Sequence, residues 1–291
     1  MMTEQGLLLK GVGGFYDALV GKEVVRTTAR GVFRKQGISP MIGDHVLLKR
    51  QKEGHAQLAE ILPRRNTLLR PTVANVDRLM ILVSAQYPEP DWLLTDKLIL
   101  QARAQDIEPV LLLNKMDNAR HEIVDTFSQD YRHFPTCLIS AVTGEGLDTL
   151  QGYLHGHICC FCGQSAVGKS SVLNALFPEL NLSVGELSRK TEHGRHTTRH
   201  AQLIPLLGGA VLDTPGFSLL DLLPEEQQAL DCYYPEFGQA APCRFPGCRH
   251  ITEPDCGVQE LVSAGHITEG RYRRYTIIAD EIEARRKRRY D

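Results

Sequence analysis

The chain has 291 residues and a mass of 32.5 kDa, and 42% of its residues are hydrophobic and 23% charged. This composition is typical of a soluble globular protein and argues against disorder and fibrous repeats. The longest apolar runs, such as 79–83, are far shorter than the roughly 18 residues that a membrane-spanning helix needs. No export signal is visible at the N-terminus, so we expect a cytoplasmic protein without membrane contact.

The net charge of −2 hides a separation of charge along the chain. Residues 1–70 carry 12 Lys and Arg against 6 Asp and Glu, and residues 271–291 carry 8 against 4, whereas residues 71–270 carry 13 against 25. Two basic ends on an acidic middle suggest a polyanionic partner touched at both ends. Charge alone leaves ordinary solvated surface as an equal alternative.

Three regions follow one another along the chain. Up to about residue 70, glycine turn signals separate short stretches rich in Val, Thr and basic residues, which predicts a small β domain. Apolar strands then alternate with helical segments, the pattern of a parallel sheet covered by helices. The expected strands are 79–84, 110–113, 138–140, 158–162, 201–206 and 210–212, and the expected helices are 91–105 and 171–177. Beyond Pro224, a cysteine-bearing segment leads into an Arg-rich tail.

The motif Asn-Lys-Met-Asp at 114–117 follows an expected strand and indicates which base is bound. The Asp117 carboxylate can accept hydrogen bonds from the N1–H and amino group of guanine, whereas adenine has no donor at N1 and would leave the carboxylate unpaired. Asn114 would face the opposite edge of the base, the Lys115 stem would pack on its face, and the Ala141 N–H would lie near the guanine oxygen. The predicted base-binding residues are Asn114, Lys115, Met116, Asp117, Ser140 and Ala141.

The stretch 163–170 fits the phosphate-loop pattern G-x-x-x-x-G-K-[ST] and lies between an expected strand and an expected helix. Its backbone N–H groups can surround phosphate oxygens, Lys169 should reach the β and γ phosphates, and the Ser170 hydroxyl should bind Mg²⁺. In the later turn 213–216, Asp213 would hold Mg²⁺ through water and the Gly216 N–H would face the γ-phosphate. The predicted phosphate-binding residues are Gly163, Gln164, Ser165, Ala166, Val167, Gly168, Lys169, Ser170, Ser171, Asp213 and Gly216.

The order of these motifs is shifted. In the common Ras-like order the phosphate loop comes first and the base motifs last, whereas here both base motifs precede Gly163. The cyclic order is preserved, as it would be if a Ras-like domain were opened before its base-binding half and its old termini joined. Such a circular permutation is tolerable because each strand keeps its place in the sheet.

With these motifs in this order, the sequence resembles the RsgA (YjeQ) family of circularly permuted GTPases, which assist late maturation of the bacterial small ribosomal subunit. The resemblance covers essentially the whole chain, including the segments 65–71, 74–77 and 194–198. It implies an RNA-binding OB-fold β-barrel at 1–70, a circularly permuted Ras-like P-loop GTPase domain of the α/β class at 71–222, and a zinc-binding, mostly helical domain at 223–291. It also implies hydrolysis of GTP to GDP with stimulation by the small (30S) subunit, contact with 16S rRNA, and a monomer.

Two positions depart from common patterns. Ala166 stands where the family usually has glycine, so nucleotide affinity would be reduced if that position needs a positive φ. Phe217 stands where Ras-like enzymes commonly place the glutamine that orients the attacking water, and phenylalanine cannot hydrogen-bond to water.

The resemblance points to His196 as the residue that positions the water, and a neutral imidazole can do so near pH 7. A plain surface histidine is the alternative, since His193 and His200 are neighbours. Either Thr197 or Thr198 would ligate Mg²⁺. The predicted catalytic residues are His196, Lys169 and Thr198.

Four metal ligands of suitable type fall within fourteen residues: Cys243, Cys248, His250 and Cys256. Three thiolates and one imidazole suit a tetrahedral Zn²⁺ with no open position, hence a structural role. Buried free thiols are the alternative, and Cys232 is a weaker candidate ligand. The cysteines at 159, 160 and 162 lie in an expected strand, where packing explains them better.

The tail 271–289 has a helix-like pattern with Ile277, Ile278 and Ile282 available for packing, and ends in the basic run 285–289. Contact with RNA phosphates is the functional interpretation, and a solvated helix end is the alternative. Two other functions stay open: a P-loop ATPase or kinase, which the 114–117 motif disfavours, and a binding module in which GTP only regulates docking, which Phe217 leaves possible.

Overall fold

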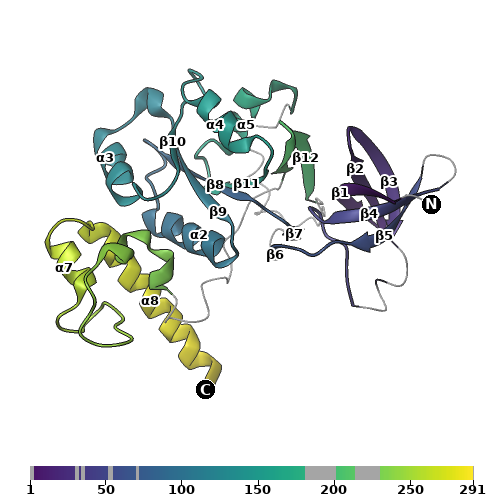
Figure 1. Ribbon diagram of the computed structural model, residues 1–291. Helices are drawn as coiled ribbons and strands as arrows, with labels where there is room; N and C mark the ends of the chain where they lie inside the picture. Colours follow the sequence, from purple (N-terminus) through teal and green to yellow (C-terminus); the bar gives the residue numbers. More distant parts are fainter. Residues whose placement is uncertain are drawn as a thin grey trace.

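The computed structural model describes residues 3–29, 33, 37–51, 55–69, 72–180, 201–213 and 230–290. Figure 1 shows three parts: an N-terminal barrel, a central sheet flanked by helices, and a mostly helical C-terminal region that ends in one long helix. This architecture confirms the predicted fold class. No helix within the described ranges is long and apolar enough to cross a membrane.

The N-terminal barrel is closed, with strand order β1-β2-β3-β5-β4 and a β1–β4 pairing. Side chains alternate between the inside and the outside, so Leu8, Val46, Leu48 and Leu58 fill the interior. An irregularity between Leu8 and Lys10 shifts the register of β1, and Leu9 packs instead into the core of the central sheet. The strands are β1 (Thr3–Val12), β2 (Phe15–Val20), β3 (Glu23–Ala29), β4 (His45–Arg50) and β5 (Ala56–Ile61).

A two-stranded ribbon, β6 (Thr67–Leu69) and β7 (Thr72–Ala74), joins the barrel to the sheet. Asn66 and the Val76 backbone exchange two hydrogen bonds of 2.8 and 2.9 Å. Asn75 donates to the Gly43 carbonyl of the barrel at 2.8 Å, and Asp77 accepts from the Ile158 N–H of the sheet at 2.6 Å. The described residues 65–69 and 74–77 of the two segments noted in the sequence therefore join the barrel to the sheet.

The central sheet has the order β10-β9-β8-β11-β13-β12, and all its strands are parallel except β12, which runs antiparallel to β13. The carboxyl ends of the five parallel strands consequently lie along one edge. The strands are β8 (Arg78–Ser84), β9 (Glu108–Asn114), β10 (Thr136–Leu138), β11 (Ile158–Gly163), β12 (Gln202–Leu206) and β13 (Gly209–Asp213).

Helices cover both faces of this sheet, which is why its strands are almost continuously apolar. Ile81 and Cys160 face the cluster that contains α2 and α3, whereas Met80 and Cys159 face the cluster that contains α4 and α5. The packing role expected for the strand cysteines is confirmed. The helices are α2 (Trp92–Ala104), α3 (His121–Asp130), α4 (Leu147–Leu154) and α5 (Lys169–Leu176).

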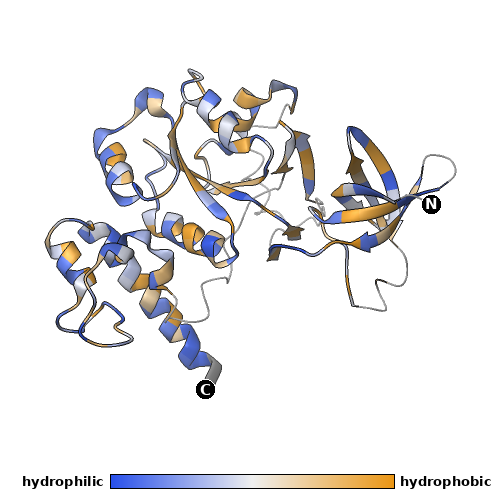
Figure 2. Ribbon diagram, in the orientation of Figure 1, coloured by the Kyte–Doolittle hydropathy of each residue, from blue (hydrophilic) through white to orange (hydrophobic). Residues whose placement is uncertain are grey.

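The C-terminal region contains the 3₁₀ turns Asp231–Tyr233 and Pro235–Gln239, α7 (Gly257–Ser263) and α8 (Glu269–Tyr290). Ile278 and Ile282 are buried in its core, but Ile277 is 36% exposed and does not take the predicted packing role. Figure 2 shows hydrophobic residues along the strands of the barrel and sheet and hydrophilic residues along the last turns of α8.

A buried ionic network holds α8 against the helices of the central sheet. Arg271 is 2% exposed and lies 2.6 Å from Asp96 of α2 and 2.7 Å from Glu236. Arg274 lies 2.6 Å from Asp96 and 2.7 Å from Asp130 of α3. The C-terminal region is thus tied to two helices of the central domain.

Candidate functional site

The predicted nucleotide-binding residues gather along the carboxyl edge of the sheet. The loop after β9 carries 114–117, the loop after β10 carries 140–141, and the loop after β11 carries 163–168. Because β9, β8 and β11 are adjacent parallel strands, chain order does not affect which loops meet. Strand β10 ends at Leu138, so Ser140 lies two residues beyond the strand rather than at its predicted end.

The phosphate loop has the backbone that its glycines require. Gly163 has φ 128°, and a Cβ there would lie 2.2 Å from the Leu82 carbonyl oxygen. Gly168 has φ 99°, and a Cβ there would lie 2.5 Å from the Asn114 side chain. Ala166 has φ 63°, so the position does adopt the left-handed conformation, which disfavours alanine by about 1 kcal/mol.

Lys169 opens α5 and folds back over this loop. Its Nζ donates to the carbonyl oxygens of Gly163 at 2.9 Å and Gln164 at 2.8 Å. Burial lowers the pKa of Lys169 from its usual value. Ser170 follows on the same turn and is 7% exposed. The ammonium group and the hydroxyl therefore lie at the N-terminus of a helix, where phosphate groups bind.

In the base-binding loops, a chain of hydrogen bonds fixes the carboxylate that would read guanine. The Ser140 hydroxyl donates to Asp117 Oδ1 at 2.7 Å, and Asn118 donates to Oδ2 at 2.6 Å. The hydrogen bond from Ser140 is the main reason that the pKa of Asp117 is lowered, so the group stays anionic at neutral pH. The Asp117 side chain is exposed to solvent.

Direct contacts join the base-binding loop to the phosphate loop. Asn114 is 1% exposed and donates from Nδ2 to the Val167 carbonyl at 2.9 Å, while its Oδ1 accepts from the Ala141 N–H at 3.3 Å. Lys115 Nζ donates to the Ala166 carbonyl at 3.0 Å, and burial lowers its pKa. The two loops thus hold each other in place.

Sequence reasoning missed a third loop at this edge, the one between β8 and α2. Its Tyr87 carbonyl accepts from Lys115 Nζ at 2.6 Å, and its Asp91 N–H donates to the Gln164 side chain at 3.3 Å. Both contributions come from backbone groups, which carry no side-chain signal in the sequence. Its position after an expected strand was the available clue.

Part of the predicted catalytic apparatus lies outside the described residues. His196, Thr197, Thr198, Gly216 and Phe217 fall in the ranges 181–200 and 214–229, and the Asp213 side chain is also outside the description. The backbone of Asp213 ends β13, next to β11, at the edge that carries the phosphate loop.

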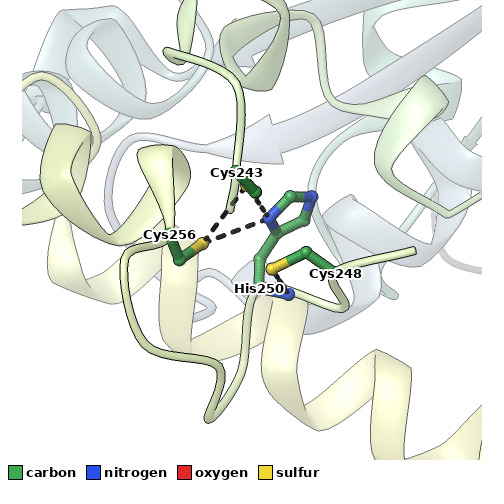
Figure 3. Close-up of side chains that lie close together, drawn as sticks. All are labelled: Cys243, Cys248, His250 and Cys256. Atoms are coloured by element: carbon green, nitrogen blue, oxygen red, sulfur yellow. Dashed lines mark hydrogen bonds between the residues drawn. The ribbon is translucent and has the colours of Figure 1, made fainter. Parts of the chain in front are cut away.

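The four predicted metal ligands come together in the C-terminal region, as Figure 3 shows. The ligand atoms all lie within 4.8 Å of one another. His250 turns Nδ1 into the group, 3.5 Å from Cys243 Sγ and 3.2 Å from Cys256 Sγ. Three thiols and an imidazole at this spacing suit a structural metal ion.

Contacts around this group hold its loops. The His250 N–H donates to Cys248 Sγ at 3.4 Å, and the hydroxyl of Tyr272 donates to the His250 carbonyl at 2.7 Å. Burial disfavours the Glu253 carboxylate, but N–H donors of residues 249 and 251–253 lower its pKa to about 2. In the described part of the chain, Cys232 is exposed and lies outside the four-residue group.

The phosphate loop and the predicted guanine-binding loop contact each other at the edge of a Ras-like sheet. Because the base-binding loop comes first in the chain, these features define a circularly permuted P-loop GTPase. In a comparison with protein families, the family model described as RsgA GTPase matches residues 61–223, and the family model described as RsgA N-terminal domain matches residues 5–58. The chain belongs to the RsgA GTPase family, whose members hydrolyse GTP.

Relatives extend this likeness over the full length. A small ribosomal subunit biogenesis GTPase RsgA from Geobacillus sp. (strain WCH70) is 41% identical over 98% of this chain and 99% of its own. One from Caldanaerobacter subterraneus subsp. tengcongensis is 43% identical over 98% of both chains. The crystal structure of YjeQ from Thermotoga maritima is 33% identical, with a TM-score of 0.84 over 97% of this chain and 99% of that one. The structure of YloQ, a circularly permuted GTPase, has a TM-score of 0.82 at 33% identity, over 98% and 96% of the two chains.

Proposed function

We propose that this GTPase acts on the small ribosomal subunit, that it assists the subunit's late maturation, and that the subunit stimulates hydrolysis of GTP to GDP and phosphate. The contact between the two loops carries the nucleotide half of the proposal, because Asn114 and Lys115 hold the phosphate loop from the base side. The names of the relatives supply the ribosomal half.

The site residues take separate roles in this proposal. Asp117, kept anionic by Ser140, accepts the N1–H and amino hydrogens of guanine. When the nucleotide binds, Lys169 gives up its hydrogen bonds to the carbonyl oxygens of Gly163 and Gln164 and donates to the β and γ phosphate oxygens instead. Ser170 binds Mg²⁺ together with Asp213 and either Thr197 or Thr198, and the bound ion would neutralise charge on the phosphates.

We assign the positioning of the attacking water to His196, because Phe217 cannot hydrogen-bond to water. Replacing His196 with alanine should abolish most turnover and leave GTP binding unchanged. Unchanged turnover would remove His196 from the mechanism.

We assign Zn²⁺ to the Cys₃His group. A tetrahedral ion with metal–sulfur bonds of about 2.3 Å separates two thiolate sulfurs by about 3.8 Å. Cys243 Sγ and Cys256 Sγ are 3.8 Å apart, which supports this identity. With all four positions filled by protein, the ion would stabilise the fold and take no part in hydrolysis.

We propose that the chain works as a monomer in the cytoplasm, with an RNA-binding domain at 1–70, the GTPase domain at 71–222 and the zinc-binding domain at 223–291. The basic charge of residues 1–70 and of the tail 271–291 supports contact with 16S rRNA phosphates at both ends of the chain.

Turnover of GTP with and without purified small subunits tests the proposal, with large subunits as the matched control. We expect a large stimulation by small subunits alone. Equal turnover in all three conditions would instead favour a module in which GTP state only regulates docking. Affinity for the subunit should also fall steeply with salt if phosphates are contacted.

A further inference from the structure

Glu253 lies between the last two metal ligands along the chain, and its carboxylate faces its own backbone. The Arg249 N–H donates to Oε1 at 2.9 Å, and the N–H groups of Ile251 and Thr252 donate to Oε2 at 3.0 and 3.1 Å. Both oxygens of the carboxylate are therefore engaged by the loop. Within the described residues, Glu253 lies outside the group of four metal ligands, so its contacts are with the loop that carries a ligand.

The remaining N–H group of this stretch belongs to the ligand His250 and has a different acceptor. It donates to Cys248 Sγ at 3.4 Å, while the Tyr272 hydroxyl donates to the His250 carbonyl at 2.7 Å. Every N–H group of residues 249–252 is thus paired, one with a ligand sulfur and the other three with Glu253. The carboxylate consequently holds the backbone on both sides of His250.

This support matters because His250 has an unfavourable backbone conformation. Its φ is 57°, in the left-handed region, where the Cβ of an L-residue comes too close to the neighbouring backbone. In this conformation the imidazole turns Nδ1 toward the thiols, 3.5 Å from Cys243 Sγ and 3.2 Å from Cys256 Sγ. Without an external restraint the backbone would relax toward negative φ and carry the ring away from the thiols.

Contacts of the imidazole ring itself do not supply that restraint. The ring meets Phe237 edge-on, with the two ring centroids 5.6 Å apart. Its Nε2 lies 3.9 Å from the Asp231 carboxylate, which is beyond hydrogen-bond distance. These contacts limit the side-chain torsions of His250, whereas its φ depends on the hydrogen bonds of the backbone around it.

We propose that Glu253 is a positioning residue of the metal site, whose carboxylate holds residues 249–252 in the conformation that aims His250 at the ion. An anionic acceptor suits this role because hydrogen bonds to a carboxylate are stronger than those to a neutral oxygen. Residues that orient a ligand without touching the metal typically change metal affinity by roughly 10- to 100-fold. The inference rests on the proposed assignment of Zn²⁺ to the Cys₃His group.

Equilibrium competition for Zn²⁺ between the purified full-length protein and a chromogenic chelator tests this role. Glu253→Ala should bind Zn²⁺ roughly 10- to 100-fold more weakly. Glu253→Gln keeps one acceptor oxygen and should recover part of the loss. Glu260→Ala is the matched control, because it removes an exposed carboxylate from α7, the helix that begins after Cys256, and should leave the affinity unchanged. Equal losses in Glu253→Ala and Glu260→Ala would overturn the proposal, since charge alone would then explain both.

A second measurement separates positioning of the ligand from general stability. When Co²⁺ replaces Zn²⁺, its visible absorption bands depend on which ligands are bound. We expect Glu253→Ala to shift these bands, because His250 leaves the ion in part of the molecules. Ile278→Val, which only trims the buried core of the same region, should leave the bands in place. GDP binding must be equal in all variants, which shows that the GTPase domain is folded.

The outcomes distinguish this inference from the metal assignment on which it rests. If the wild-type protein binds no Zn²⁺, the metal assignment itself fails. If the wild type binds Zn²⁺ and Glu253→Ala binds it equally tightly, only the role of Glu253 is overturned. Weaker binding with unchanged Co²⁺ bands would also overturn that role, because Glu253 would then stabilise the fold without positioning His250.

Discussion

The docking of the C-terminal region depends on one buried carboxylate, Asp96, which is fully inaccessible to solvent. Its two oxygens lie 2.6 Å from Arg271 and 2.6 Å from Arg274, and the Tyr131 hydroxyl donates to it at 2.6 Å. Replacing Asp96 with alanine removes the hydrogen-bond acceptor of Arg274 and Tyr131 and one ion-pair partner of Arg271. We therefore expect the substitution to destabilise the junction between α2 and α8.

The loss of unfolding free energy in the Asp96→Ala variant depends on which ion pairs the two arginines keep. Breaking a buried ion pair by removing one partner costs about 3–5 kcal/mol. Arg271 keeps Glu236 at 2.7 Å and Arg274 keeps Asp130 at 2.7 Å, so the loss should be at the low end, about 3 kcal/mol. With a urea dependence of about 3 kcal/mol per molar, the unfolding midpoint should fall by about 1 M.

Tryptophan fluorescence is a suitable reporter because the chain has one tryptophan. Trp92 lies one turn before Asp96 on α2, and its ring centroid is 5.9 Å from that of Tyr131. Lys97→Ala is the matched control: it removes an ion pair with Glu281 between the same two helices, but one that is partly exposed and worth about 1 kcal/mol at most. Equal midpoint shifts for the two variants would refute the reasoning.

Two further predictions concern the nucleotide site and the thiols. Asp117→Asn should lower GTP affinity by about 100-fold or more because a carboxamide cannot accept both guanine hydrogens, and competition with labelled GDP would measure it. Asn118→Ala removes one hydrogen bond to the Asp117 carboxylate but keeps the carboxylate, so it should change affinity far less, and equal effects would contradict the role of Asp117. Burial raises the pKa of Cys159 to about 12 and that of Cys160 to about 12, so both thiols should stay protonated and unlabelled by iodoacetamide from pH 7 to 9. The exposed Cys232 should react first, and mass spectrometric detection of label at 159 or 160 in the folded protein would contradict the prediction.

The nucleotide loops were predictable from the sequence because their chemistry needs particular residues at fixed spacing. Gly163 and Gly168 adopt positive φ, and the Cys₃His ligands converge as predicted. The effect of Ala166 could be stated only conditionally, since φ is not visible in a sequence.

Elements without special chemistry were harder to predict. The helix α3 was not among the expected helices because it is short and mostly polar, although its buried residues Ile123, Phe127 and Asp130 recur at helical spacing. Asp96 and Arg271 look like ordinary surface charges in the sequence. Their burial depends on the packing of α8 against α2. The two residues are 175 positions apart in the chain, so local sequence carries no sign of this contact.

The permutation leaves the site intact because a parallel sheet brings its loops together by strand position rather than by chain order. Strands β9 and β11 flank β8, so Asn114 reaches Val167 whichever strand comes first. What the permutation changes is the place where other domains attach. The barrel now enters through the ribbon before β8, where Asn75 binds its Gly43 carbonyl, and the C-terminal region follows the end of β13 and returns to α2. The GTPase core thus keeps its nucleotide site while it carries a basic barrel before it and a region with a basic C-terminal tail after it.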